Sequence, residues 1–510
     1  MEQKHAIALP LSGDHRRSTH RSAWRRKKRA ALTFGESLSV DDPIFRQQDK
    51  HVFCFTWGGR PVYSRLGQRM HMLPFFAAML ALVSLIQASG NTPRVVRTGD
   101  RIFVFETSEP LLFVAVGKIS CNSENQLRQE LRMLRSQLLS VLTPAILEAV
   151  EHRPTLDVSS QLQGTDMLLH ALVDSFEYDH SYALRAIAPL RFPADKRAQL
   201  AQIVKDARQK VLKKETELRR SIACAVVVAG DRVVILAQSK RASLCTGDLL
   251  LLLHFVRHMY SLRGDRDREN WSPVCLPQLA DVPVHVHTRF VRPDIAVALV
   301  SLDATLFQAA SRVSEYIAAT AQESGLWDDV ETALNQGDCD IGVDQFNQAL
   351  SSLRHLCVHS TNRQQWFQTT PALPYVVRNH ADLPMQRPQG TDLFRLVRSM
   401  FARLESLDTE HDTPLAEMSD AVEDDSGLRL VVAVHEKEVC VAWRTKQLRA
   451  VAGTKQRHQR ISAGAFIRVR LCPVLAPLVS PHSVATTLPE LLKERLSTLE
   501  KFVFADSLQF

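Results

Sequence analysis

The stretch that decides the fold is His51-Val-Phe-Cys-Phe-Thr-Trp57, then Gly58-Gly59, then Arg60-Pro-Val-Tyr-Ser-Arg-Leu66. Two strand-like runs flank a pair of glycines, and glycine supplies the positive φ that a tight hairpin turn requires. We therefore predict a β-hairpin here.

The segment that follows, Met72–Ile86, is apolar at almost every position, and Ser89-Gly90-Asn91 closes it as a helix C-cap. A helix that lies on a sheet and faces water needs only one apolar stripe. At about 15 residues the segment is shorter than the roughly 20 of a bilayer span. We expect one face to pack on the sheet and the other on another protein. Burial under later parts of the same chain is the alternative that the pattern leaves open.

The rest of the first unit reads as two more strands and a series of helices. Ser123-Glu-Asn-Gln126 is a capping-box pattern that predicts the start of a helix, and Pro144 is expected to bend or end that helix. The other expected elements are strands Ile102–Glu106 and Leu111–Val116 and a charged helix Ala194–Arg220.

Two later parts of the chain repeat the order of hairpin, helix, strands and helix. Between the helix and the later strands of the second unit, residues 263–270 are expected to form a solvated loop. The second unit is predicted to contain strands Ile222–Ala229, Arg232–Gln238, Val282–Phe290 and Ile295–Leu302, a helix from Asp248 and a helix Ala304–Thr320. The third is predicted to begin at Leu353, with a helix Asp392–Met400 and strands Leu428–Val434, Val439–Arg444 and Ala465–Leu471.

Three separated groups of residues resemble one family. Lys50-His-Val-Phe53, Gly59-Arg-Pro-Val-Tyr-Ser-Arg65 and Ala81-Leu-Val-Ser84 are similar to the first longin domain of the SAND family, the Mon-one vacuolar fusion proteins. Gly247-Asp-Leu249 with Trp271-Ser-Pro-Val-Cys-Leu-Pro277, and Leu353-Arg-His-Leu356, follow in the family's order. The resemblance spans residues 48–480, although Arg69–Met72 and Pro74 depart from the helix start expected of the family.

The predicted fold class is therefore α+β, with three consecutive longin-type domains, each an antiparallel sheet flanked by helices. The expected boundaries are 1–47 for a disordered basic tail, 48–220, 221–335 and 350–485 for the three longin domains, and 486–510 for a C-terminal helix or tail.

Composition places the chain among multidomain proteins with real cores, because it has 510 residues, 45% of them hydrophobic and 23% charged. Its nine cysteines are scattered and several stand inside apolar strands, which is typical of reduced core cysteines in a cytosolic protein. We expect no signal peptide, because no apolar run follows the first residues, and no myristoyl anchor, because Glu2 replaces the required glycine.

The tail concentrates the positive charge of the sequence, whose net charge is +8. A basic segment with one tryptophan suits anionic lipid, nucleic acid or a nuclear import receptor, or has no specific partner. The resemblance favours lipid, because Mon-one proteins act on phosphoinositide-bearing endosomes. The candidate lipid-binding residues are Arg25, Arg26, Lys27, Lys28 and Arg29.

No catalytic motif stands in the sequence: a Walker A loop, a dinucleotide-binding glycine motif, a nucleophile elbow and H-E-x-x-H are all missing. His285-Val-His287 puts two imidazoles on one strand face, but no carboxylate or cysteine signature accompanies them. Asp338–Asp344 lacks the glycine and the final acid of an EF-hand loop. We expect no cofactor, no metal and no covalent active site.

The resemblance implies one subunit of a heterodimeric guanine-nucleotide exchange factor. In that family a Mon-one protein pairs with a second longin protein, Ccz-one, and the first longin domains present a platform to a late-endosomal Rab GTPase of the Rab-seven type. It also implies an upstream early-endosomal Rab, an anionic phosphoinositide membrane, recruitment from the cytoplasm to late endosomes or vacuoles, and roles in endosome maturation, vacuole fusion and autophagy. Exchange is differential binding to the nucleotide-free GTPase and needs no nucleophile.

The platform is expected on the apolar helix and the hairpin. The candidate residues are Trp57, Tyr63, Arg65, Phe75, Phe76, Met79 and Val83, with burial in an ordinary core as the alternative for each apolar one. A longin adaptor that holds trafficking proteins without promoting exchange is the alternative function. Nucleic-acid binding is disfavoured, because the basic charge is confined to one short segment.

Overall fold

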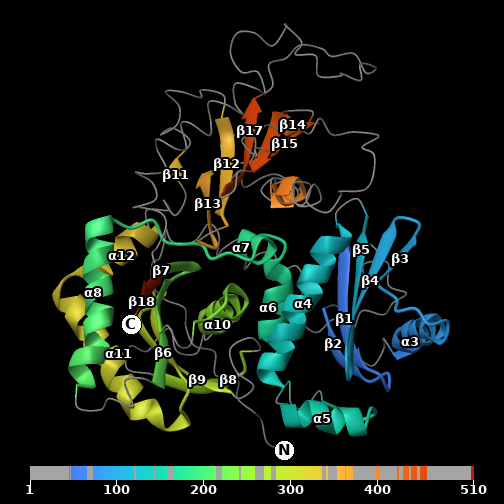
Figure 1. Ribbon diagram of the computed structural model, residues 1–510, viewed down its shortest axis with the longest axis horizontal. Coiled ribbons are helices and arrows are strands. Elements are labelled where there is room, and N and C mark those ends of the chain that lie inside the picture. The colour runs from blue at the N-terminus through green and yellow to red at the C-terminus, as the bar shows by residue number, and fades with distance from the viewer. Residues whose placement is uncertain are drawn as a thin grey trace, which may run out of the picture.

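Three sheets, one in each successive part of the chain, form the architecture, with helices between and around them (Figure 1). The structure is a computed structural model. The part of the chain that it describes comprises residue 45 and residues 48–65, 73–119, 122–142, 144–158, 162, 165–213, 221–239, 243–258, 269–276, 283–335, 341–342, 353–361, 363–370, 394–395, 397–401, 422–423, 429–435, 438–444, 448–455 and 507–509.

The predicted hairpin is confirmed as strands β1 (Lys50–Thr56) and β2 (Pro61–Ser64), which pair antiparallel. Gly59 takes a φ of +76°, where a side chain would strain the backbone. Gly58 is needed for a different reason: a Cβ there would lie 2.4 Å from the carbonyl oxygen of Pro154. Each glycine of the turn therefore has its own steric role.

The first sheet has the order β2-β1-β5-β4-β3, so the first strand lies beside the last long one. The two predicted later strands are confirmed. Strand β3 was not predicted, because its four residues, two apolar and then two polar, show no alternation. The remaining strands are β3 (Val95–Thr98), β4 (Arg101–Ser108) and β5 (Leu111–Lys118).

Helices cover both faces of this sheet (Figure 1). The apolar segment forms α3 (Leu73–Ala88) on one face. The predicted capping box begins the helix on the other face, with both reciprocal hydrogen bonds between Ser123 and Gln126 present. That helix ends before Pro144, as predicted. The helices on the second face are α4 (Glu124–Val141), α5 (Pro144–His152) and α6 (Asp166–Ser175).

The second sheet repeats the strand order of the first, as β7-β6-β10-β9-β8. Residues 269 and 270, expected in a loop, begin the edge strand β8, because their backbones pair with β9. The elements are β6 (Ile222–Ala229), β7 (Arg232–Gln238), α10 (Thr246–His258), β8 (Glu269–Val274), β9 (Val284–Arg292), β10 (Ile295–Ser301), the 3-10 turn η4 (Ala304–Leu306), α11 (Phe307–Glu323) and α12 (Leu326–Asn335).

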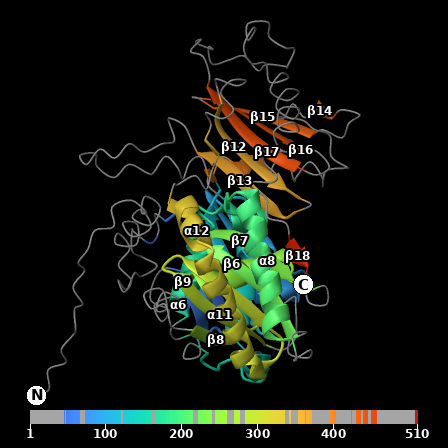
Figure 2. The ribbon, with the colours of Figure 1, turned by 90° about the vertical axis from the view of Figure 1, so that its left-hand side faces the viewer.

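Helix α8 (Ala194–Val211) differs from the sequence-based assignment to the first domain. Its buried residues Leu200 and Val204 share a core with Val227 of β6 and Ile317 of α11. The helix therefore covers the second sheet together with α11 and α12, as Figure 2 shows. The predicted continuation of the helix beyond residue 213 lies outside the described residues up to residue 220.

The third sheet contains the same order once more, as β13-β12-β17-β16-β15, with short strands at both edges. The strand at 448–455 was not predicted, and the predicted strand Ala465–Leu471 lies outside the described residues. That this unit is a third longin domain stays a prediction. Its strands are β11 (Ile341–Gly342), β12 (Leu353–Ser360), β13 (Gln365–Thr370), β14 (Val422–Glu423), β15 (Arg429–His435), β16 (Glu438–Arg444) and β17 (Leu448–Lys455).

The two ends of the chain hold the remaining differences. Most of the predicted tail, with Arg25, Arg26, Lys27, Lys28 and Arg29, lies outside the described residues, but the ring of Phe45 stacks on His51 at 4.0 Å. At the other end, β18 (Ser507–Gln509) is a strand of the second sheet, in a region expected to be a helix or tail.

Replacing Phe76 of α3 with alanine tests the inward face of that helix. Phe76 is fully buried among Phe53, Phe55 and Phe75. We expect a loss of about 3–5 kcal/mol in local stability, the usual cost of such a cavity. Leu85→Ala, where the side chain is 70% exposed, should change it by less than about 0.5 kcal/mol. Hydrogen exchange of β1 and α3 amides measures both, and equal effects would contradict this orientation of the helix.

Candidate protein-docking surface

Helix α3 is seated on the first sheet by aromatic contacts. The ring centroid of Phe76 lies 4.8 Å from that of Phe55, in a stacked arrangement, and 5.8 Å from that of Phe53, edge-on. Phe75 adds a fourth ring, with its centroid 5.0 Å from that of Phe53. Val83, two turns further along, is also fully buried. Phe75, Phe76 and Val83 therefore lie on the side of α3 that faces the sheet.

The opposite face of α3 consists mainly of small apolar residues. At 3.6 residues per turn, these positions fall on the side away from Phe76 and Val83. All of them are exposed, and Leu85 is the most exposed large hydrophobic residue in the described part of the chain, at 70%. The outer face comprises Pro74, Ala77, Ala78, Ala81, Ser84, Leu85 and Ala88.

Helix α10 occupies the equivalent place in the second unit, because it follows the second strand and precedes the third along the chain. Unlike α3, it is covered on both sides. Leu249–Leu253 and Val256 are all buried. The imidazole of His254 donates from Nε2 to the Leu168 carbonyl at 2.9 Å and accepts at Nδ1 from the Tyr182 hydroxyl at 3.1 Å. Burial lowers the pKa of His254, which keeps the ring neutral for this pairing. The outer face of α10 is thus taken by helices of the first unit.

The third unit places a helix at the equivalent position too, made of helical residues 394, 395 and 397–401; we call it the third-unit helix. Phe394 stacks on His180 at 4.3 Å, and His180 belongs to α7 (His180–Leu184), just after α6. The Arg395 guanidinium lies 3.1 Å from the Asp49 carboxylate. This helix, like α10, is covered by the first unit.

Within the described residues, the chain therefore covers two of its three equivalent helices and leaves the outer face of α3 open. An exposed helix face made mainly of apolar residues is typical of a surface that another protein covers. Small side chains allow the backbone of a partner to approach closely. We refer to the seven outer residues of α3 as the α3 outer face.

The predicted platform residues lie in several different environments. Phe76, Val83 and Tyr63 are fully buried, so they are not displayed to a partner in this structure. Trp57, Phe75 and Met79 are partly buried and pack against the core beneath α3. Sequence reasoning selected the largest apolar side chains, which are the ones that the sheet buries. The small residues between them, repeating at helical spacing, were the signal for the outer face.

Two predicted hairpin residues face the other side of the sheet. The Tyr63 hydroxyl lies 3.2 Å from Nδ1 of His170 on α6, and burial raises the pKa of that hydroxyl. Arg65 bridges the carboxylates of Asp174 at 3.0 Å and Glu177 at 3.1 Å. Tyr63 and Arg65 thus fasten the hairpin to α6, away from α3. Whether a partner contacts any of the seven predicted residues stays a prediction.

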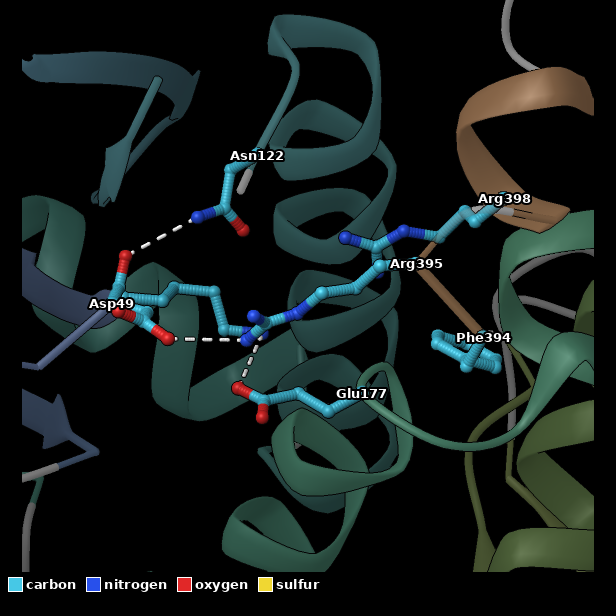
Figure 3. Close-up of a pocket in the computed structure, with 7 residues that line it drawn as sticks. Asp49, Asn122, Glu177, Phe394, Arg395 and Arg398 are labelled. Atoms are coloured by element: carbon cyan, nitrogen blue, oxygen red, sulfur yellow. Dashed lines mark hydrogen bonds and ion pairs between the residues drawn. The ribbon is translucent and has the colours of Figure 1, made fainter. Parts of the chain in front are cut away.

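A cluster of charged residues fills the junction between the first unit and the third-unit helix (Figure 3). Lys50 is 2% exposed and its ammonium lies 2.7 and 2.9 Å from the two oxygens of Glu130 on α4. Glu177 is a second carboxylate 3.6 Å away. Asp49 joins Arg395 to Lys118, at 3.1 and 3.0 Å.

Arg398 completes this cluster from the third-unit helix. Its Nη1 donates to the Phe176 carbonyl at 2.7 Å, and its Nη2 to the Gln126 amide oxygen at 3.1 Å. Burial lowers the pKa of Arg398. The cavity that the cluster encloses is about 10 Å³, at the lower limit for one water. The cluster is largely paired within the chain, so its chemistry is structural rather than catalytic.

The two histidines of the His285-Val-His287 motif, where no metal is expected, make contacts with protein groups. His287 is buried with Nε2 2.8 Å from Glu269, and burial lowers its pKa to about 4. His285 stacks on Trp271 at 5.3 Å. Within the described ranges, no group of three or more His, Cys, Asp or Glu residues is arranged to hold a metal ion.

No described helix has by itself the length and apolar character needed to cross a membrane. Helices α4 and α5 meet both measures only as a pair bent by 105°.

Comparison with known proteins identifies the two units that carry these features. Residues 50–172 match the family model of the first longin domain of FUZ, MON1 and HPS1, and residues 221–318 match that of the second. The relatives are vacuolar fusion protein MON1 homologues. Residues 50–172 and 221–318 are thus the first and second longin domains of the group that comprises FUZ, MON1 and HPS1. These two longin domains are built on the first and second sheets.

The similarity to individual MON1 homologues is moderate. The Arabidopsis thaliana homologue is 28% identical over 323 residues, 63% of this chain and 50% of its own length. Human homologue B is 32% identical over 249 residues, 48% of this chain and 43% of its own. Human homologue A is 31% identical over 287 residues, which are 56% of this chain and 42% of its own length. The aligned part thus spans half or less of these relatives.

The Lys50–Glu130 pair offers a test of the charged junction. Lys50→Met leaves the buried Glu130 carboxylate without its main partner, and Glu130→Leu does the same to Lys50. We expect each single change to cost about 3–5 kcal/mol, and the double replacement to cost less than either, because no charge is then left unpaired. Urea unfolding of the four proteins measures this cycle. Additive losses in the double variant would contradict the pairing.

Proposed function

We propose that this chain is a subunit of a heterodimeric guanine-nucleotide exchange factor for a late-endosomal Rab GTPase of the Rab-seven type, acting in vacuole fusion and endosomal trafficking. The relatives are named vacuolar fusion proteins, and we extend that role to this chain. The observation that carries the proposal is the α3 outer face, an apolar helix face that the chain itself leaves open.

The proposed first partner is a longin protein of the Ccz-one type, docked by its own first domain against the α3 outer face. A partner helix can pack closely there, because Ala77, Ala78, Ala81 and Ala88 present only methyl groups. Desolvation of these residues and of Leu85 supplies an apolar contact of the kind found at the centre of stable interfaces.

The exchange step then follows from differential binding. A factor releases GDP when it binds the nucleotide-free GTPase more tightly than the GDP-bound form, and it does so without a nucleophile, metal or cofactor of its own. A rigid platform serves this purpose. In the first domain rigidity comes from the aromatic seat of α3 and from the buried Lys50–Glu130 pair below the sheet. Recruitment by an early-endosomal Rab and an anionic phosphoinositide membrane completes the proposal.

Release of a fluorescent GDP analogue tests the function. The assay uses a late-endosomal Rab with this chain alone, with the chain co-purified with a Ccz-one-type longin protein, and with an early-endosomal Rab as substrate control. We expect the complex to accelerate release from the late-endosomal Rab only. A stable complex that accelerates release from neither Rab would overturn the exchange-factor proposal and favour a longin adaptor.

A pair of matched variants tests the surface. Ala81→Arg places a large, charged side chain at the centre of the α3 outer face. Ala319→Arg makes the same change at an exposed position of helix α11 in the second domain. We expect Ala81→Arg to weaken binding to the longin partner at least about tenfold, or 1.4 kcal/mol, with Ala319→Arg unchanged. Equal binding by both variants would show that the partner docks elsewhere.

A further inference from the structure

The outer edge of β7 is a strand-pairing site in the second domain. In the strand order β7-β6-β10-β9-β8, one side of β7 has no neighbour among the domain's own five strands. An edge of this kind exposes N–H and C=O groups to which any extended segment can bind. What occupies this edge therefore matters for the assembly.

The first half of the edge is occupied by the connection between the first and second domains. The Val233 amide donates to the Ala188 carbonyl at 2.9 Å, and the Leu190 amide donates to the Val233 carbonyl at 2.8 Å. The same connection pairs on its other side with the third unit, because the Trp366 amide donates to the Ile187 carbonyl at 3.0 Å. The Arg232 guanidinium lies 5.4 Å from the centre of the Trp366 ring. Three units thus meet at this edge.

The second half of the edge is occupied by β18, in parallel. Ser507 is paired with Leu236, Leu508 with Ala237 and Gln509 with Gln238. In Figures 1 and 2 β18 lies next to the marked C-terminus, alongside the second sheet. On β7 itself, Leu236 is 5% exposed and Ala237 is fully buried, so this stretch of the edge is covered.

The pairing of β18 with β7 brings the chain back to the second domain after the third unit. The chain leaves the second domain after α12, forms the third sheet, and returns to β7 for its last strand. The third unit is therefore attached to the second domain at both of its ends. Three residue pairs make a weak strand by themselves, but tethering raises the effective concentration of the segment at its site.

We propose that residues 507–509 form an intrachain latch: a strand that docks on the β7 edge at Leu236–Gln238, closes that edge to other extended segments, and fastens the far end of the third unit to the second domain. The occupant is this chain's own final segment. A strand from a second copy or from another protein would compete for the same backbone groups. The latch does not depend on the proposed exchange activity.

Engineered cysteines in the full-length chain test the register. Ala237→Cys with Leu508→Cys joins a directly paired position, whereas Ala237→Cys with Ser507→Cys is the offset control, because successive strand residues alternate between the two faces of a sheet. We expect at least tenfold more disulfide between 237 and 508 than between 237 and 507, by peptide mass spectrometry. Equal yields would overturn the latch, and so would a disulfide that links two copies of the chain.

Removal of the strand provides a second test. In a chain that ends at residue 505, we expect amide hydrogen exchange in Leu236–Gln238 to accelerate at least tenfold, and a peptide of residues 501–510 to restore the protection. The same peptide with both Leu508→Pro and Gln509→Pro lacks two successive backbone N–H groups, one on each side of the strand, and should fail. Unchanged exchange after truncation would overturn the proposal, as would equal protection by both peptides.

Discussion

The packing of α6 between two cores is the contact on which the arrangement of the molecule depends. Leu169 and Val173 of this helix belong to the core of the first domain, while Leu172 and Phe176, at its other face and end, belong to that of the second. Because α6 packs on both cores, it buries the outer face of α10, and no helix in the described part of the chain covers α3 in the same way. The open face of α3 is thus a consequence of where the second domain sits.

A platform of this kind relies on shape and desolvation, not on reactive groups. The ionisable residues at the junction with the third unit are engaged with one another: Lys50 with Glu130, Asp49 with Arg395, and Arg65 with Asp174 and Glu177. Burial holds the pKa of His51 at about 3, so this ring beside the cluster stays neutral at physiological pH. The Asp49–Arg395 pair joins the first unit to the third-unit helix, whereas the other pairs hold the first unit together.

Local signals in the sequence predicted most of the elements. The glycines at 58–59 and 230 mark hairpins, and Ser123 with Gln126 marks a helix start, because in each case the interacting atoms are a few residues apart. The four-residue strand β2 was predicted because the glycine pair marks its start, whereas β3 and β18, of four and three residues, carry too little periodicity to be predicted. The inward direction of Phe76 and the covering of α10 by α6 depend on packing between distant segments, which a single sequence does not reveal. For the same reason the predicted platform mixed residues that face opposite sides of one sheet.

We infer that α10 is covered within the chain and that the outer face of α3 is left for a partner. Amide hydrogen exchange of the full-length chain, alone and in complex with a Ccz-one-type longin protein, tests it most directly. We expect the complex to slow exchange across residues 77–88 of α3, while exchange in residues 249–256 of α10 is slow in both states and does not change. Exchange in α3 that is the same in the free chain and in a stable complex would contradict it.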